Sequence, residues 1–336
     1  MADARPGLSA ERLVRLVRDA VNRCALDLSG LTVLTEAATG PYVVTPVLAA
    51  LAGAEVLAIT STSTFGTVED VESATRAVAD ALCVTNKITI TTERTPELFE
   101  QADVVTNSGH VRPIVGEFAA AIKPTAVVPL MFESWEVQAG RFDIDVELMR
   151  ARGVQMAGTN ERHPDVDVFS YLGPTAVVQL ADAGIPAYRT AISVLCDNPF
   201  SDYIVSGLCA AGATVQAGNR LPDLLDGPAP EALLIAMTPT GRSIVTTEDV
   251  SQIAATWPGS VVVQFWGDVD RTACTTTGVP VWPIVPPAAG HMGVLPSRVG
   301  PDPVVRLQAG GLKVAQVLRT PPKARSAADL ERLDAF

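Results

Sequence analysis

Apolar positions recur at helical spacing over residues 9–26, and Ser9 is placed to cap the start of that helix. After it, short apolar runs alternate with longer helical patterns. The short runs predict strands at 31–35, 55–60, 88–91, 103–106, 125–130 and 154–157. The longer patterns predict helices at 44–53, 67–83, 95–101, 112–122 and 144–152. Strands that are apolar on both faces and are separated by helices indicate a parallel sheet covered on both sides.

The pattern then restarts after a predicted crossover helix at 168–184. Residues 33–56 and 194–215 share a layout: a strand, a polar loop, a tyrosine (Tyr42 or Tyr203), an Ala/Leu-rich helix and a Gly-Ala pair. Further matched pairs of segments are 102–110 with 231–242, 123–136 with 258–270, and 152–164 with 277–292. We infer a tandem duplication whose second copy lacks a strand or two. The alternative is one generic strand–helix rhythm that occurs twice.

The predicted fold class is α/β, with two tandem Rossmann-like doubly wound parallel-sheet domains and an inter-domain cleft. The length of 336 residues suits two domains. The predicted organisation is an N-terminal helix (1–29), a first domain (30–167), a crossover helix (168–189), a second domain (190–301) and a C-terminal helix with its tail (302–336).

The charge and the cysteine content argue against several classes of partner and structural site. The net charge is −12 without any Lys/Arg cluster, which argues against nucleic acid. The five cysteines are scattered without a CxxC pair, so we expect neither a zinc ribbon nor a disulfide framework. Charged residues interrupt the N-terminal stretch, and no apolar run approaches the ~18 residues of a membrane span. We therefore expect a cytoplasmic protein with a small-molecule substrate and no membrane partner, and a homodimer stays open.

The three histidines all lie where predicted strands end, which is where open α/β sheets bind their ligands. They are His110, His163 and His291. One interpretation is that at least one acts as a general acid or base in the inter-domain cleft. Others are that His110 and His163 cap loops, or that the histidines share a metal. No HxH or HExxH spacing occurs, so we expect no metal.

Carboxylates and arginines accompany the histidines. Glu161 precedes His163, and Glu133 follows the fifth predicted strand with Glu136. Glu36 and Asp197 hold similar places after the first strands of the two halves. Each acid either binds a ligand, orients a histidine, or is a solvated loop acid or helix cap. The candidate catalytic set is His110, His163, Glu161, Glu133 and His291. Arg112 (at the start of a predicted helix), Arg162 and Arg242 are candidates for clamping an anion.

The first strand-to-helix turn, at 35–46, carries Gly40 alone, and no Gly-x-Gly occurs in the chain. The dinucleotide fingerprint needs such glycines for close approach to the pyrophosphate. Thr45 as N-cap and Pro46 after it predict a helix whose N-terminus can still take an anion. The second strand ends in hydroxyl residues rather than an acid. Cofactor-binding candidates are Glu36, Thr39, Gly40, Ser61, Thr62, Asn107 and Ser108.

The segment ADVVTNSGHVRPIVGEFAAAIKPTAVVPL (102–130) carries a family resemblance. With it, residues 30–165 resemble the nucleotide-binding domain of the D-2-hydroxyacid dehydrogenase and S-adenosylhomocysteine hydrolase superfamily. The run at 33–59 is also similar to a methyltransferase first motif. The resemblance implies an oxidoreductase that uses NAD or NADP on a small polar substrate, with His110 or His163 passing the proton. Two alternatives stay open: a lyase, cyclase or transferase that works by His/Glu acid–base chemistry, and a non-catalytic two-lobed binding protein.

Overall fold

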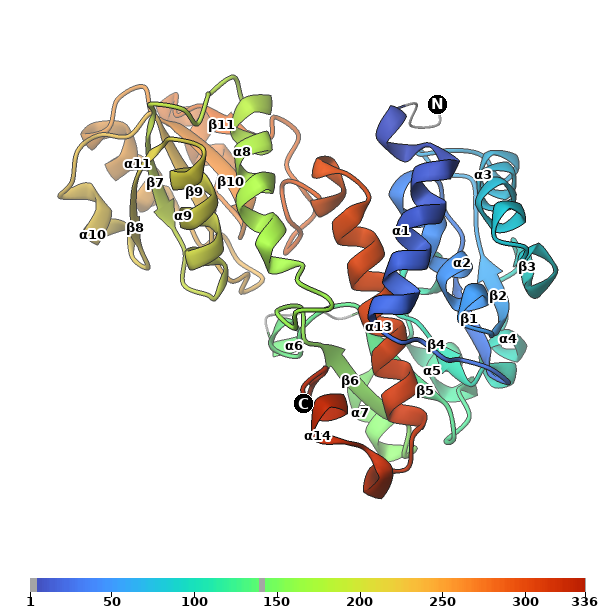
Figure 1. Cartoon of the computed structure of the whole chain (residues 1–336). Coiled ribbons are helices and arrows are strands. Elements are labelled where there is room, and N and C mark those ends of the chain that lie inside the picture. The colour runs from blue at the N-terminus through green and yellow to red at the C-terminus, as the bar shows by residue number, and fades with distance from the viewer. Residues whose placement is uncertain (1–4, 139–142, 336) are drawn as a thin grey trace. The chain divides into compact units, whose positions relative to one another are not determined.

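The computed structural model describes residues 5–138 and 143–335, so residues 1–4 of the predicted N-terminal segment lie outside it. The chain forms two compact units (Figure 1). Unit 1 combines Met1–Val168 with Gly300–Phe336, and unit 2 is Phe169–Val299. Each unit contains its own parallel sheet, as the predicted fold class requires.

Unit 1 is built on a seven-stranded sheet with the order β12-β6-β5-β4-β1-β2-β3. Its strands are β1 (Thr32–Glu36), β2 (Glu55–Ile59), β3 (Ile88–Thr91), β4 (Val104–Val105), β5 (Val127–Leu130), β6 (Gln155–Thr159) and β12 (Leu333–Asp334). All neighbours are parallel except β12, which runs antiparallel to β6 at the edge. Between β6 and β3 the order is that of a doubly wound Rossmann sheet, in which the chain reverses its direction of winding between β1 and β4.

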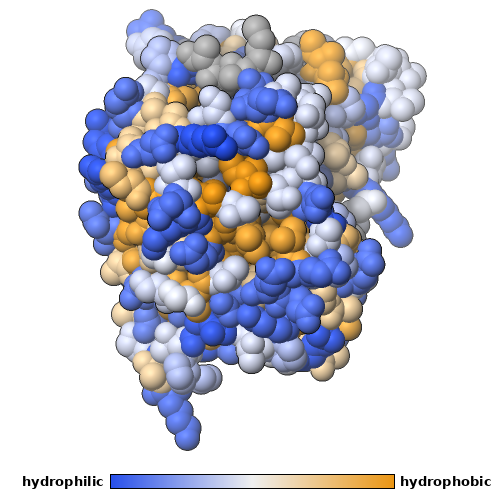
Figure 2. Space-filling model, turned by 90° about the vertical axis from the view of Figure 1, so that its right-hand side faces the viewer, coloured by the Kyte–Doolittle hydropathy of each residue, from blue (hydrophilic) through white to orange (hydrophobic). Residues whose placement is uncertain are grey.

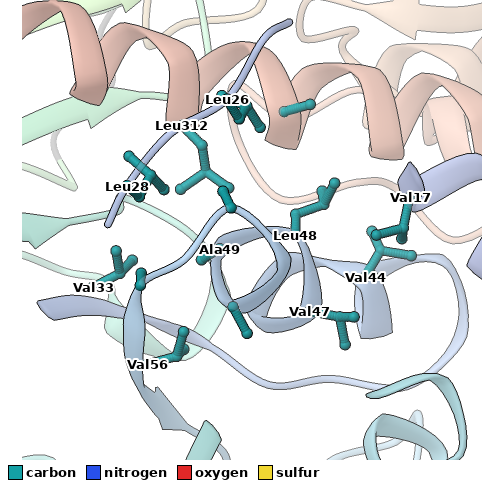
Figure 3. Packing of buried hydrophobic residues seen from close by; sticks show 14 of the residues in the cluster. Val17, Leu26, Leu28, Val33, Val44, Val47, Leu48, Ala49, Val56 and Leu312 are labelled. Atoms are coloured by element: carbon teal, nitrogen blue, oxygen red, sulfur yellow. The ribbon is translucent and has the colours of Figure 1, made fainter. Parts of the chain in front are cut away.

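Helices cover both faces of this sheet. They are α1 (Ala10–Arg23), α2 (Val44–Leu51), α3 (Val68–Ala81), α4 (Pro96–Gln101), α5 (Gly116–Ala121), α6 (Trp135–Gln138), α7 (Val146–Ala151), α13 (Asp302–Arg319) and α14 (Ala327–Leu330). Val33 packs with α1, α2 and α13 in one apolar cluster (Figure 3), whereas its neighbour Leu34 packs in a second cluster with α4, α5 and α7. Successive strand residues therefore bury against opposite helical layers, which is why the strand sequence is continuously apolar.

Unit 2 has a smaller, fully parallel sheet with the order β11-β10-β9-β7-β8. Its strands are β7 (Ala191–Leu195), β8 (Thr214–Gly218), β9 (Ala232–Ala236), β10 (Val261–Trp266) and β11 (Val281–Trp282). Its helices are α8 (Leu172–Asp182), α9 (Phe200–Ala210), α10 (Leu221–Leu225), α11 (Thr247–Thr256) and α12 (Arg271–Thr277). Helices α8 and α9 meet at Gly173 and Gly207, where a Cβ on Gly207 would lie 2.4 Å from the Gly173 Cα. Only glycine permits so close a crossing.

The two sheets share one winding. Strands β7, β8, β9, β10 and β11 occupy the places that β1, β2, β4, β5 and β6 occupy in unit 1, and no described strand of unit 2 corresponds to β3. These are the pairs that the matched sequence segments predict, so the prediction of two Rossmann-like parallel sheets is confirmed.

Local capping explains where several helices start. The Ser9 hydroxyl accepts the backbone N–H of Arg12, as predicted. Helix α2 begins at Val44, as the range 44–53 predicts, but the N-cap predicted at Thr45 is wrong, because Thr45 lies inside the helix that follows a 3-10 turn over Gly40–Val43. The helix start predicted at Arg112 is also wrong. Arg112 is extended and α5 begins only at Gly116, because a residue that precedes proline is kept out of helical conformation.

On the face shown in Figure 2, polar residues surround apolar ones that are partly exposed. Within residues 5–138 and 143–335, no helix is both long and apolar enough to cross a bilayer.

Candidate functional site

The loops that follow β1, β2 and β4 meet at the carboxyl edge of the unit 1 sheet, where its winding reverses. We call these loops the unit 1 switch point. A buried hydroxyl network lies at its base. The Thr106 hydroxyl donates to Thr35 Oγ1 at 2.9 Å and lies 2.7 Å from Ser108 Oγ. Ser108 Oγ is in turn 3.3 Å from Thr35 Oγ1. These contacts fix the loop after β4 against the end of β1.

Glu36 ends β1 and is almost fully buried, with 5% of its surface exposed. Its carboxyl group fills the space beside Gly109: a Cβ on that residue would lie 1.5 Å from Glu36 Oε2. Burial raises the pKa of Glu36 from 4.5 to about 7, although the charge of Arg112 and a hydrogen bond from the His110 backbone N–H oppose the rise. Near neutral pH this carboxyl group is therefore partly protonated and can donate a hydrogen bond as well as accept one.

His110 connects the loop after β4 to the loop after β2. Its Nδ1 lies 3.1 Å from Ser61 Oγ. Partial burial lowers the pKa of His110 from its ordinary value of 6.5, which favours the neutral imidazole. The switch point thus brings together the predicted residues Glu36, Ser61, Ser108 and His110 from three loops.

The remaining cofactor candidates of unit 1 differ in how exposed they are and in whether their polar groups already have partners within the protein. The Thr39 hydroxyl donates to the Phe65 carbonyl at 3.0 Å, which ties the loops after β1 and β2 together. Gly40 has a φ of +63°, and no atom lies within 4 Å of the position of an added Cβ. Thr62 is exposed. Asn107, in contrast, is buried, and its Oδ1 accepts the Met131 N–H at 2.8 Å. Asn107 therefore holds the end of β5 in place.

His163 and Glu161 follow β6, which is two strands away from β4 on the same sheet edge. His163 Nδ1 accepts the Asp165 N–H at 3.1 Å, and Arg332 pairs with Asp165 at 2.6 Å. Burial, together with the charge of Arg332, lowers the pKa of His163, and the nearby carboxylate of Asp165 opposes this. These contacts are those of a loop cap, and the catalytic role of His163 and Glu161 stays a prediction.

Glu133 is fully buried at the end of β5 and has two partners. Its Oε2 accepts the Trp135 Nε1–H at 2.8 Å, and its Oε1 pairs with Arg162 Nε at 3.2 Å. Arg112 likewise pairs with Asp143 at 2.9 Å. Both arginines thus have partners within the protein.

Unit 2 has its own switch point, formed by the loops that follow β7 and β9. The Asn198 amide donates to the Ala236 carbonyl at 2.7 Å and accepts the Phe200 N–H at 3.0 Å. Asp197 Oδ1 accepts both the backbone N–H and the hydroxyl of Thr238, at 2.8 and 3.0 Å. The two loops are therefore bonded directly to each other. His291, on another loop of unit 2, is exposed with Nδ1 3.1 Å from the Ala289 carbonyl, and its catalytic role stays a prediction.

Two residues of the unit 1 switch point were not among the predicted ones. Gly109 accommodates Glu36, and Phe65 exposes 70% of its surface on the loop after β2. The sequence could have indicated Gly109, because this residue stands between the candidates Ser108 and His110. No sequence pattern indicates that the ring of Phe65 lies exposed beside the site. In the part of the chain that the structure describes, no three His, Cys, Asp or Glu residues are grouped to hold a metal ion.

Comparisons with known proteins identify the fold. No protein-family model matches the sequence, and no curated protein matches it. Among solved structures, a component of dipicolinate synthase from Bacillus halodurans is 13% identical with a TM-score of 0.55, covering 88% of this chain and 100% of that one. A dipicolinate synthase chain from Bacillus subtilis is 11% identical with a TM-score of 0.54, covering 88% and 97%.

A looser match is a cofactor (NAD+)-bound 3-phosphoglycerate dehydrogenase from Entamoeba histolytica, with 8% identity, a TM-score of 0.44 and coverage of 69% and 86%. At such low identity these likenesses show the fold alone. The Rossmann-type architecture that the sequence resemblance implies for residues 30–165 is thereby confirmed.

Proposed function

We propose that the chain is an oxidoreductase that binds a nicotinamide dinucleotide at the unit 1 switch point and acts there on a small polar substrate. The observation that carries this proposal is the convergence of Glu36, Ser61 and His110 from three loops at the winding reversal of a Rossmann sheet. Ligands of open α/β sheets bind at this position. The two dipicolinate synthase structures share this fold.

The residues of unit 1 fit a dinucleotide better than those of unit 2. Phosphates need a first turn at which they can approach the backbone, and the open space at Gly40 offers one. A Glu36 that is partly neutral repels them less than a fully charged acid would. In unit 2, Asp197 and Asn198 stand at the equivalent turn and bond across it. The hydroxyl groups of Thr39, Ser61 and Thr62 are the groups that we expect to hold the cofactor, be it NAD or NADP.

The chemistry divides between the cofactor and this chain. The dinucleotide supplies or accepts a hydride when bound. The chain's own contribution is the proton. Partial burial favours the neutral ring of His110, and Ser61 contacts its Nδ1, which suits a general base that removes a proton from a substrate hydroxyl. In the reverse direction the protonated ring returns it.

A second candidate is proton-transfer catalysis without a redox cofactor, as in a lyase or cyclase. The absence of any Gly-x-Gly favours it, since neither first turn has the glycine pair that brings backbone to a pyrophosphate. In this alternative Glu36 and His110 form the acid–base pair, because the pKa of Glu36 is about 7 and that of His110 lies below 6.5.

Fluorescence titration with NADH and NADPH tests the proposal. Two exposed switch-point residues offer a matched pair of blocking variants. We expect Ser61→Trp, in unit 1, to abolish binding and Asp197→Trp, in unit 2, to leave it unchanged. The opposite pattern would move the cofactor to unit 2, and absence of binding by the unmodified protein would favour the second candidate. With binding shown, turnover is then sought with small hydroxy and oxo acids and with dipicolinate, the compound for which the two neighbours are named.

A further inference from the structure

Phe65 stands at the tip of a tight turn in the loop after β2 and has 70% of its surface exposed. The turn closes on itself, since Ser63 N–H donates to the Gly66 carbonyl at 3.0 Å and Gly66 N–H donates back at 3.3 Å. The Ser63 hydroxyl also accepts the Phe65 N–H at 3.1 Å. The backbone polar groups of the turn are thus bonded locally, and its shape does not depend on burying the ring.

The turn is also anchored at both ends. On one side, the Phe65 carbonyl accepts the Thr39 hydroxyl, and a Cβ on Gly66 would lie 3.0 Å from Thr39 Cγ2. On the other side, Thr67 and Asp70 form a capping box that starts α3 directly after the turn. The aromatic ring is therefore held out from a fixed backbone, beside the first turn of the sheet.

A ring exposed in this position is available to bury its apolar surface against a ligand. Turn chemistry favours small polar residues and does not require an aromatic one. In a Rossmann sheet the adenosine half of a dinucleotide extends toward the end of the second strand, where an acid commonly binds the ribose. Here that strand ends in hydroxyl residues, followed by Phe65.

We propose that Phe65 is the face on which the adenine base of the bound dinucleotide stacks. This inference rests on the proposed function, since it places the base of the same ligand at the same switch point. A flat purine on a phenyl ring gains stacking energy whatever polar groups it carries, so the contact recognises the base by its shape.

Calorimetric titration with ADP-ribose, which keeps the adenine half and lacks the nicotinamide, and with NADH tests the inference. We expect Phe65→Ala to weaken the binding of both by about tenfold. Phe65→Leu, which keeps apolar surface without a π-face, should recover little of the loss. Ile284→Ala is the matched control, because Ile284 is an apolar residue of unit 2 that is 77% exposed. It should leave both affinities unchanged.

A second variant supplies a spectroscopic readout. In Phe65→Trp we expect AMP and ADP-ribose to quench the added tryptophan emission, whereas nicotinamide mononucleotide does not. Equal affinities of the unmodified protein, Phe65→Ala and Phe65→Leu would overturn the stacking role and leave the proposed function standing. No binding of ADP-ribose or NADH by the unmodified protein would overturn both. A change of self-association in Phe65→Ala with unchanged nucleotide affinity would assign the ring to a protein contact instead.

Discussion

The two switch points have the same strand order, but their polar side chains are used differently. In unit 1, the loops after β1 and β4 meet through a buried carboxyl group whose pKa is about 7, beside a glycine with space for it. In unit 2, the loops after β7 and β9 are joined by Asn198 and by the Asp197–Thr238 bonds. The first arrangement leaves a titratable group and the open backbone of Gly40 at the sheet edge. The second uses its polar groups to hold the unit together.

On the proposed function, the place of a loop in the fold does not by itself decide whether the loop binds a ligand. Strand order determines where a site is possible, and side chains decide whether it exists. Two sheets with the same winding can therefore differ at the turn where a phosphate would approach the backbone. We therefore predict different effects on stability and nucleotide affinity for substitutions in the two units.

The largest effect is expected from Glu36→Gln. Below pH 4.5 both the folded and the unfolded protein carry a protonated Glu36. Between pH 4.5 and about 7 the unfolded chain releases this proton and the folded chain keeps it, so the free energy of unfolding falls as the pH rises and levels off above. A pKa gap of this size corresponds to about 3 kcal/mol. Chemical denaturation across pH 4–8 should show this slope in the unmodified protein and its loss in Glu36→Gln.

The control for this experiment is Glu55→Gln, because Glu55 is an exposed acid at the start of β2. It should leave the pH profile of stability unchanged. A profile that is equally steep in Glu36→Gln would show that folding does not raise the pKa of Glu36, and the contrast between the two switch points would then disappear.

In unit 2, Asn198→Ala should reduce the free energy of unfolding by about 2 kcal/mol, since it removes the support of the α9 start and leaves the Ala236 carbonyl without its partner. Asn198→Asp keeps the acceptor for the Phe200 N–H but turns a carboxylate oxygen toward the Ala236 carbonyl and Asp197, so it should cost at least as much. Nucleotide affinity should not change in either variant. A loss of affinity at unchanged stability would mean that this loop binds a ligand after all.

The sequence predicted the sheets well because their central strands, such as β4, β5 and β9, are apolar and buried on both faces. It also placed Glu36, Ser61 and His110 correctly at strand ends. It did not predict which of them meet, because that depends on strand order and on the missing side chain of Gly109. Partners such as Arg332, which pairs with Asp165 beside His163, come from the far end of the chain, and no local pattern predicts them. Loop residues whose polar groups cap their own turn look the same in sequence as residues that face a ligand.

His163 tests how far the site extends along the edge of unit 1. His163→Ala removes the acceptor for the Asp165 N–H, and we expect a loss of about 1 kcal/mol in the free energy of unfolding with nucleotide affinity unchanged. His163→Asn retains a side-chain oxygen that can accept the same bond and should recover most of the loss. A fall in turnover of about 10²-fold in both variants at unchanged stability would instead establish His163 as the general acid or base.

The smallest expected change in stability belongs to Ser61→Ala, since an exposed hydrogen bond contributes below about 1 kcal/mol. Its useful readout is the ring of His110. The Ser61 hydroxyl lies at Nδ1, so its removal should shift the ¹⁵N resonance of that nitrogen in NMR spectra while the ring of His163, which has no contact with Ser61, keeps its signals. Ser61→Thr, which retains a hydroxyl, should restore the original resonance. If the His110 signals stay the same in Ser61→Ala, the loops after β2 and β4 are not joined in solution, and the convergence on which the proposed function depends is lost. A shift confined to His110 would confirm the contact between Ser61 and His110 at the unit 1 switch point. The loops after β7 and β9 in unit 2 contain no histidine that could make such a contact.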